Sequence, residues 1–224
     1  MKSLAALGVC LALLVSNEMA QSRIRAVHAS PDAPPVDIYV DGQKTLEGIP
    51  FGDYSDYLTI PSGQHNIAVF AAGTMTKVID TNPNLSPGQD YSVVAAGFAG
   101  GETPGLRLLL LYDTTPDPGL NSAKVRVVHA APSAPAVDVH WTGPYQTLMN
   151  RMPVLASVPF GGASGYLSVP AGQYQARVTP AGTTTVAINS GRIVLPGNAI
   201  RTVIALDNEG GGTPFGAIVL LDRN

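Results

Sequence analysis

The sequence has little of what several function classes require. It holds one cysteine, Cys10, in 224 residues, so it can form no disulfide within the chain and no metal site made of several thiolates. Charged residues make up only 13% and the net charge is −3, which leaves no concentrated basic surface for a phosphate backbone. We therefore expect no nucleic acid partner, and a fold held together by buried apolar side chains.

Long apolar runs are also lacking, except at the N-terminus. Lys2 precedes an apolar stretch from Leu4 to Val15, which suits a signal peptide and is too short to cross a bilayer. We expect a signal peptide of residues 1–20, cleaved after Ala20, and a mature chain without cysteine or membrane span. This predicts an exported protein that is periplasmic, cell-surface or extracellular. The alternative is an N-terminus that stays uncleaved.

The rest of the chain contains an internal repeat. Residues 23–38 (RIRAVHASPDAPPVDI) return as residues 124–139 (KVRVVHAAPSAPAVDV), and residues 50–74 return as residues 159–183. The spacing grows from 101 to 109 residues through an insertion near residues 143–154. A period of about a hundred residues is that of a domain, which indicates duplication of a whole fold.

The two copies span residues 21–113 and 123–224, and residues 114–122 have the composition of a linker. Within each copy apolar and polar residues alternate, as in residues 36–41, and Gly and Pro turn signals recur every eight to twelve residues or so. No long run has a helical period. The sequence predicts an all-β protein of two tandem immunoglobulin-like antiparallel β-sandwich domains, with about seven strands each.

Residues 86–95 look like the turn before a tyrosine corner. We expect the Tyr91 hydroxyl to bond the backbone upstream and fix this end of the first sandwich. Ile200 stands at the corresponding place of the second copy, so the corner is expected in the first domain only.

Three segments carry a resemblance to a known bacterial family: VHASPDAPPVDIYVDG, PFGDYSDYLTIPSGQ and SPGQDYSVVAAG. They are similar to signature segments of domain-of-unknown-function family 4397, and the resemblance covers nearly all of the mature chain, once per copy. It implies an exported or envelope-associated β-sandwich module, and it implies no activity and no catalytic residues. The second copy departs from the first by its insertion and by Gly162 and Gly165, which replace Asp53 and Asp56.

Arg25 and Asp37 reappear as Arg126 and Asp138. Alternation turns all four away from their apolar neighbours, so we expect Arg25 to pair with Asp37, and Arg126 with Asp138, across adjacent strands. The alternative is a carboxylate general base, but no nucleophile or second acid stands at a related spacing.

His28 and His129 are also matched, each in the apolar phase of its strand. We expect each to be half-buried and to bond a loop carbonyl or a nearby Asp. His140 lies in the polar phase of its strand, so it is not expected to converge with His129. No HExxH or paired CxxC pattern exists, and we expect no metal site and no cofactor.

Five residues are tentative surface binding residues: Tyr39, Asp53, Tyr54, Asp56 and His140. Asp53 and Asp56 flank Tyr54 in a loop of the first copy, but two acids are few for calcium, which takes about six to eight oxygen ligands. Tyr39 and His140 lie in the outward phase, and Trp141 lies in the core phase.

These observations favour a non-enzymatic binding or scaffolding protein of the cell envelope or exterior, with an unknown protein or glycan as its ligand. The alternatives are a carbohydrate-directed adhesion module, a hydrolase with an unrecognised site, and a purely architectural protein. A hydrolase would require an acid pair or a Ser-His-Asp cluster in a pocket.

Overall fold

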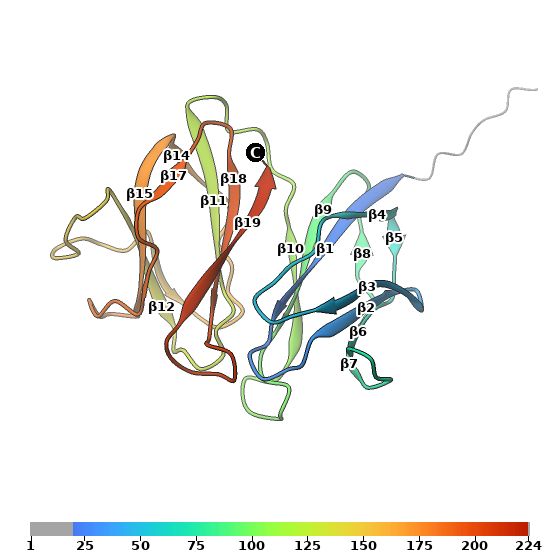
Figure 1. Ribbon diagram of the computed structural model, residues 1–224. Coiled ribbons are helices and arrows are strands. Elements are labelled where there is room, and N and C mark those ends of the chain that lie inside the picture. The colour runs from blue at the N-terminus through green and yellow to red at the C-terminus, as the bar shows by residue number, and fades with distance from the viewer. Residues whose placement is uncertain (1–19, 224) are drawn as a thin grey trace, which may run out of the picture.

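The computed structural model describes residues 20–223 as two all-β domains that lie side by side (Figure 1). The predicted signal peptide, apart from Ala20, lies outside the described residues. The described part contains no helix that is long and apolar enough to cross a membrane.

The first domain is built from ten strands: β1 (Gln21–Ala29), β2 (Val36–Val40), β3 (Gln43–Ile49), β4 (Leu58–Pro61), β5 (Gly63–Gln64), β6 (Ile67–Ala71), β7 (Lys77–Thr81), β8 (Asn84–Leu85), β9 (Asp90–Ala96) and β10 (Arg107–Tyr112). The second domain is built from nine: β11 (Ser122–His129), β12 (Val137–Thr142), β13 (Leu155–Val158), β14 (Leu167–Pro170), β15 (Gly172–Pro180), β16 (Ile188–Asn189), β17 (Ile193–Leu195), β18 (Ile200–Leu206) and β19 (Gly216–Arg223). The predicted linker lies between β10 and β11.

Each domain is a sandwich of two main sheets, which confirms the predicted fold class. The first domain has the sheets β10-β9-β1-β4 and β3-β2-β6-β7, with β5 and β8 as a separate small pair. The second has the sheets β14-β11-β18-β19 and β13-β12-β15-β16, with β17 paired to β15. All these ladders join strands of the same domain. The strand numbers exceed seven because several strands have only two or three residues.

One ladder in each domain is parallel, a difference from the antiparallel pairing that we expected throughout. β1 pairs with β9 in the same direction, and β11 pairs likewise with β18. Strands joined by a short hairpin have to be antiparallel, but the strands of these pairs lie near opposite ends of their domain sequences. The chain between them is long enough to return in the same direction.

The predicted tyrosine corner is present. Tyr91 is completely buried, and the backbone N–H of Ser86 donates to its hydroxyl at 2.9 Å. In the second domain a bulge between Ile200 and Arg201 shifts the register by one residue. On the other side of β18, Val125 pairs with Arg201 as Ile24 pairs with Tyr91 in the first domain, so Arg201, and not Ile200, lies at the ladder position of Tyr91.

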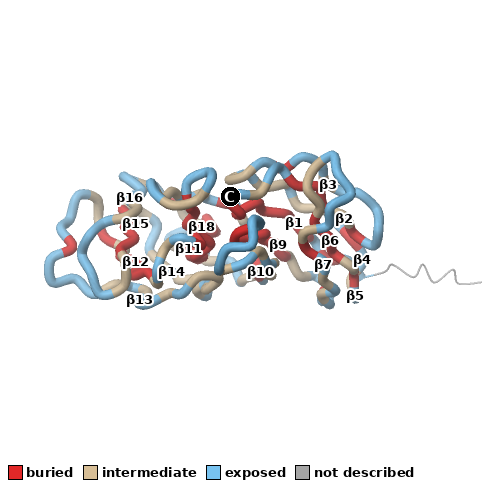
Figure 2. The backbone as a smooth tube through the Cα atoms, turned by 90° about the horizontal axis from the view of Figure 1, so that it is seen from below, coloured by how far each residue is buried: buried red, intermediate tan, exposed pale blue. Residues whose placement is uncertain are grey.

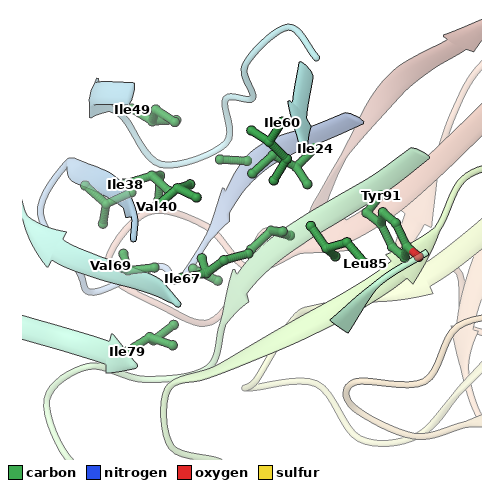
Figure 3. Packing of buried hydrophobic residues seen from close by; sticks show 14 residues of the cluster. Ile24, Ile38, Val40, Ile49, Ile60, Ile67, Val69, Ile79, Leu85 and Tyr91 are labelled. Carbon is green, nitrogen blue, oxygen red and sulfur yellow. The ribbon is translucent and has the colours of Figure 1, made fainter. Parts of the chain in front are cut away.

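The two sandwich cores differ in continuity. In the first domain one cluster of fourteen buried residues fills the space between the sheets, and Figure 3 shows Ile38, Ile67 and Tyr91 among them. In the second domain the buried residues form two separate clusters of four. One contains Val125 and Leu195, and the other contains Val139 and Val178.

A fourth hydrophobic cluster lies between the domains, where sheet β10-β9-β1-β4 faces sheet β14-β11-β18-β19. Its buried members are Val27, Ala29, Val94, Ala96, Leu111, Val128, Ala130, Ile204, Leu206 and Leu220. Figure 2 shows these buried stretches of β1, β9, β11 and β18 in the middle of the molecule. The facing strands are therefore buried on both sides, which explains apolar runs such as residues 93–96 that do not alternate.

Two reciprocal ion pairs cross this interface. Arg25 of the first domain pairs with Asp222 at the end of β19, and Arg126 of the second pairs with Asp113 just after β10, at 2.5 Å. All four side chains are at most 4% exposed. Arg25 also lies 3.6 Å from Asp113 of its own domain. The predicted pairing of Arg25 with Asp37 and of Arg126 with Asp138 is wrong, because these Arg side chains point out of their sandwich and into the interface.

Each buried carboxylate also accepts hydrogen bonds from its own domain. Tyr57 donates to Asp113 at 2.7 Å, and Tyr166 donates to Asp222 at 2.8 Å. Burial of ions is costly unless their remaining lone pairs and protons are satisfied, and these hydroxyls contribute to that. The same Tyr rings lie 4.7 Å and 4.6 Å from the guanidinium carbons of Arg25 and Arg126.

Candidate functional site

The matched acids Asp37 and Asp138 anchor backbone loops. The Asp37 carboxylate accepts from the N–H groups of Gly48 and Gly73 and contacts Lys44 Nζ at 2.8 Å. Asp138 accepts from the N–H groups of Ser157 at 2.7 Å and Gly182 at 2.8 Å. The bond to Lys44 holds the pKa of Asp37 below its usual value, and the two N–H groups do the same for the pKa of Asp138.

The matched histidines also hold loops. His28 Nε2 donates to the carbonyl of Pro34 at 3.0 Å, and His129 Nε2 donates to the carbonyl of Pro135 at the same distance. This confirms the predicted bond to a loop carbonyl. Both rings are fully buried rather than half-buried, because they lie on the inner face of their own sandwich, where His28 stands beside Ala95 of the first core and His129 lies close to Val137 and Val178. Burial lowers the pKa of each, and the carbonyl offsets only part of that effect.

The loop around Asp53 and Asp56 does not form a cation site in this structure. Asp53 accepts from the backbone N–H of Tyr54, and Tyr54 packs against the hydrophobic cluster between the domains. Across residues 20–223 no three His, Cys, Asp or Glu side chains gather in a way that suits a metal ion. Tyr39 is half-buried, and its ring lies 4.7 Å from that of Phe70.

His140 differs from its prediction as a surface residue, since it is only 4% exposed. It does lie on the outer face of its sheet, on β12, directly opposite Arg177 of β15. The outer face is covered because the inserted loop, residues 143–154, follows β12 and folds over it. The backbone N–H of Tyr145 donates to Gln175 on the same face at 2.8 Å, and Leu148 of the loop is buried.

Six buried polar residues form a layer on this face: Asp138, His140, Thr142, Gln175, Arg177 and Thr179. Some of their atoms are paired. Arg177 donates to the Thr142 hydroxyl at 2.6 Å, and Gln175 donates to Asn189 at 2.8 Å. We call this set the polar layer.

Other atoms of the polar layer have no hydrogen-bond partner although they are buried. These are both ring nitrogens of His140, Nε of Arg177 and the hydroxyl of Thr179. An unsatisfied buried polar group costs about 1–3 kcal/mol, so proteins rarely leave several together without a functional reason. Since these three residues are adjacent on two paired strands, their free hydrogen-bonding capacity is concentrated in one place.

A pocket of about 490 Å³ lies beside this layer. It is lined by Thr147, Leu148, Met149, Asn150, Arg177, Thr184 and Val186. The inserted loop supplies four of these residues and the turn after β15 supplies two, while Arg177 connects the pocket to the polar layer. We call this the loop pocket.

The same face of the first domain is built differently. Tyr39, Ala68 and Phe70 stand where the second domain has His140, Arg177 and Thr179. The Tyr39 and Phe70 rings contact each other, and a lysine ammonium lies 5.9 Å from each ring. Sequence reasoning predicted none of Arg177, Thr179 or the loop pocket. The sequence did contain one indication of this site. The second copy has both an insertion and polar residues on the neighbouring strands where the first copy has apolar or aromatic ones.

Comparison with known proteins finds no match among curated proteins. Among solved structures, the Bacillus anthracis TIE protein is 10% identical, with a TM-score of 0.28, and the match covers 85% of this chain. The chain spans only 34% of the length of that protein.

Two further structures match over most of both chains. The family CBM26 module of Eubacterium rectale Amy13K, solved with maltoheptaose, is 10% identical with a TM-score of 0.27, over 90% of this chain and 96% of the other. A putative cell adhesion protein of Parabacteroides distasonis is 9% identical with a TM-score of 0.24, over 89% and 97%. These likenesses are too distant to inform the function of this chain.

The family comparison is far more specific. The family described as "Domain of unknown function (DUF4397)" matches residues 22–140 and 142–224, which together make up nearly all of the described chain. Two successive matches agree with the duplication seen in both sequence and structure. The chain belongs to the DUF4397 family.

Proposed function

We propose that this protein is a non-enzymatic binding module of the cell envelope or exterior, and that its second domain holds the ligand in the loop pocket. The observation that carries the proposal is the group of unpartnered buried polar atoms on His140, Arg177 and Thr179, next to a pocket built by the one substantial insertion. A ligand with acceptor atoms would satisfy the donors that the fold leaves unpaired.

The chemistry of the pocket supports binding rather than turnover. Its seven lining residues include one permanent cation, Arg177, and no carboxylate or histidine. A guanidinium is suited to carboxylate and phosphate groups because its donors match their geometry. We therefore infer a ligand that carries an anionic or strongly polar group. The proposed export rests on the signal peptide that the sequence predicts for residues 1–20.

The proposal is tested with the mature protein, residues 21–224, on a glycan array and by calorimetry with envelope extract. We expect binding that Arg177→Met abolishes, because the variant removes the charge and keeps the length of the side chain. Lys77→Met on the first domain is the matched control, and it should bind normally. Equal binding by both variants, or release of a cleaved product from the ligand, would contradict the proposal.

One observation favours a carbohydrate as the ligand. Tyr145 of the inserted loop is 85% exposed, and planar exposed aromatic rings stack on sugar rings. A carbohydrate ligand predicts that Tyr145→Ala weakens binding to the glycan array while Arg177→Met abolishes it. A ligand that is a protein segment would instead appear in the extract arm and not on the array.

A further inference from the structure

Two further cavities lie inside the second sandwich, on the opposite face of β12 from the polar layer. The first, of about 230 Å³, is lined by Val125, Val127, Val139, Trp141, Val154, Leu167, Ser168 and Val169. The second, of about 210 Å³, is lined by Val125, Trp141, Ile193, Val194, Leu195, Arg201, Val203 and Val219. Val125 and Trp141 belong to both, so these two side chains separate the cavities.

The cavities extend toward opposite edges of the sandwich. The first lies against β14, the edge strand on one side of β11, and the second lies against β18 and β19 on the other side. Each reaches the surface, since Val154 at the first is 48% exposed and Val194 at the second is 62% exposed. Together they outline a narrow apolar passage across the domain, with Trp141 at its middle.

Trp141 itself is incompletely satisfied. Its indole Nε1 is buried and has no hydrogen-bond partner, although a buried indole N–H ordinarily finds one. The ring packs against Tyr174, with centroids 5.2 Å apart, and its other neighbours in the core are aliphatic. An occupant of the passage therefore meets mostly methyl and methylene groups, together with the Trp141 N–H, Ser168 at the first cavity and Arg201 at the second.

The first domain fills the corresponding space with protein. Val40 takes the place of Trp141 there, and Tyr91 takes the place of Arg201 and is completely buried. One continuous cluster of buried residues results, where the second domain has two separate clusters. The passage is thus a feature of the second copy and not of the shared fold.

We propose that the passage binds a linear aliphatic chain that passes Trp141 and whose polar end lies at a mouth, where it hydrogen-bonds with solvent. A linear chain suits two cavities in a row better than one compact ring does. Both cavities exceed the roughly 150 Å³ apolar cavity that is known to stay dry and to bind benzene in another protein. Water is a poor occupant, because the lining offers few polar partners.

The test uses saturated primary alcohols from butanol to dodecanol as probes. Trp141 is the only tryptophan of the chain, so emission excited at the red edge of its absorption, where the eight tyrosines absorb little, reports this passage. We expect a saturable change in Trp141 emission, and a Kd that falls about fourfold per added methylene until the passage is full. Calorimetry should give the same Kd values.

Two filling variants provide the structural control. Val127→Phe occupies the first cavity and Val203→Phe occupies the second, so each should shorten the longest alcohol that still gains affinity. If one variant does not fold, the other gives the same readout. Arg177→Met, on the opposite face of the sheet, should leave alcohol binding unchanged. An emission change that does not saturate, or a chain-length dependence that both filling variants leave intact, would overturn the proposal.

Discussion

The two domains share one framework and use its interior differently. The first packs a continuous core and stacks Tyr39 on Phe70 over its outer face. The second leaves cavities beside Trp141 and unpartnered polar atoms under an inserted loop. A duplicated fold can thus keep one copy closed while the other copy gives up packing, and the openings that result are where we propose that ligands bind.

The interface between the domains shows the opposite behaviour, because there the copies remain equivalent. Arg25 and Arg126 each reach the last strand region of the other domain, and Tyr57 and Tyr166 repeat the same hydrogen bond. The differences lie away from this interface, in the interiors of the sandwiches, on the far sheets and at the edges of the second sandwich.

The largest effect is expected at the interface, where the copies should respond alike. Asp113→Ala leaves the buried Arg126 without a carboxylate, and Asp222→Ala leaves the buried Arg25 with only the Asp113 carboxylate, at 3.6 Å. Each should cost about 3–5 kcal/mol of unfolding free energy. Asp90→Ala is the control, because its pair with Arg23 is exposed and should be worth about 1 kcal/mol or less. Urea unfolding measures all three, and a clear difference between Asp113→Ala and Asp222→Ala would break the equivalence.

The cores should respond in opposite directions to an added methylene. Val69→Leu overpacks the continuous first core and should cost about 1–3 kcal/mol. Val127→Leu extends into the cavity of the second domain and should be neutral or stabilising. Thermal unfolding of both variants measures the contrast. Equal losses in the two domains would show that the second core is as full as the first.

The tyrosine corner should matter in the first domain only. Tyr91→Phe removes the acceptor of the Ser86 N–H and should cost about 1–3 kcal/mol, because that N–H loses its partner. Tyr112→Phe, at a ring that is 60% exposed, is the control and should change stability by less than about 0.5 kcal/mol. Chemical unfolding measures both variants. If it gives them the same unfolding free energy, the tyrosine corner does not stabilise the first domain.

The smallest effect concerns pH, and it should be shared by the domains. The folded pKa values of His28 and His129 lie below the ordinary value of 6.5, so the unfolded chain binds more protons as the pH falls through this value. Stability should therefore decrease below about pH 6.5, by at most about 1.4 kcal/mol per pH unit for each histidine. The unfolding free energy between about pH 8 and pH 5 tests this, and His28→Gln should reduce the slope. An unfolding free energy that stays constant between about pH 8 and pH 5 would contradict the lowered pKa values of the two histidines.

Much of the fold could be predicted from the sequence, because alternation, turn residues and the repeat are local signals. Tyr91 and the loop carbonyls bonded by His28 and His129 followed from position alone. The partner of Arg25 could not be found this way, since Asp222 lies 197 residues further along the chain. Alternation shows that a side chain leaves its own core, but it does not show that a second domain receives it.

Only part of the candidate site could be predicted from the sequence. His140 was recognised as outward-facing, but its burial depends on how the inserted loop folds back, which no local pattern specifies. Arg177 and Thr179 stand opposite His140 and Asp138 only once the register of β12 and β15 is known. Cavities such as those beside Trp141 form where the summed volumes of the side chains do not fill the core. A pattern of apolar positions does not give these volumes, so it could not predict the cavities.

The central claim is that the first domain is filled and the second is open. Crystals of the mature protein under xenon pressure test it most directly, since xenon enters dry apolar cavities without a polar contact. We expect xenon on both sides of Trp141 and none within the cluster around Ile67. Xenon in the first core, or in neither domain, would contradict it.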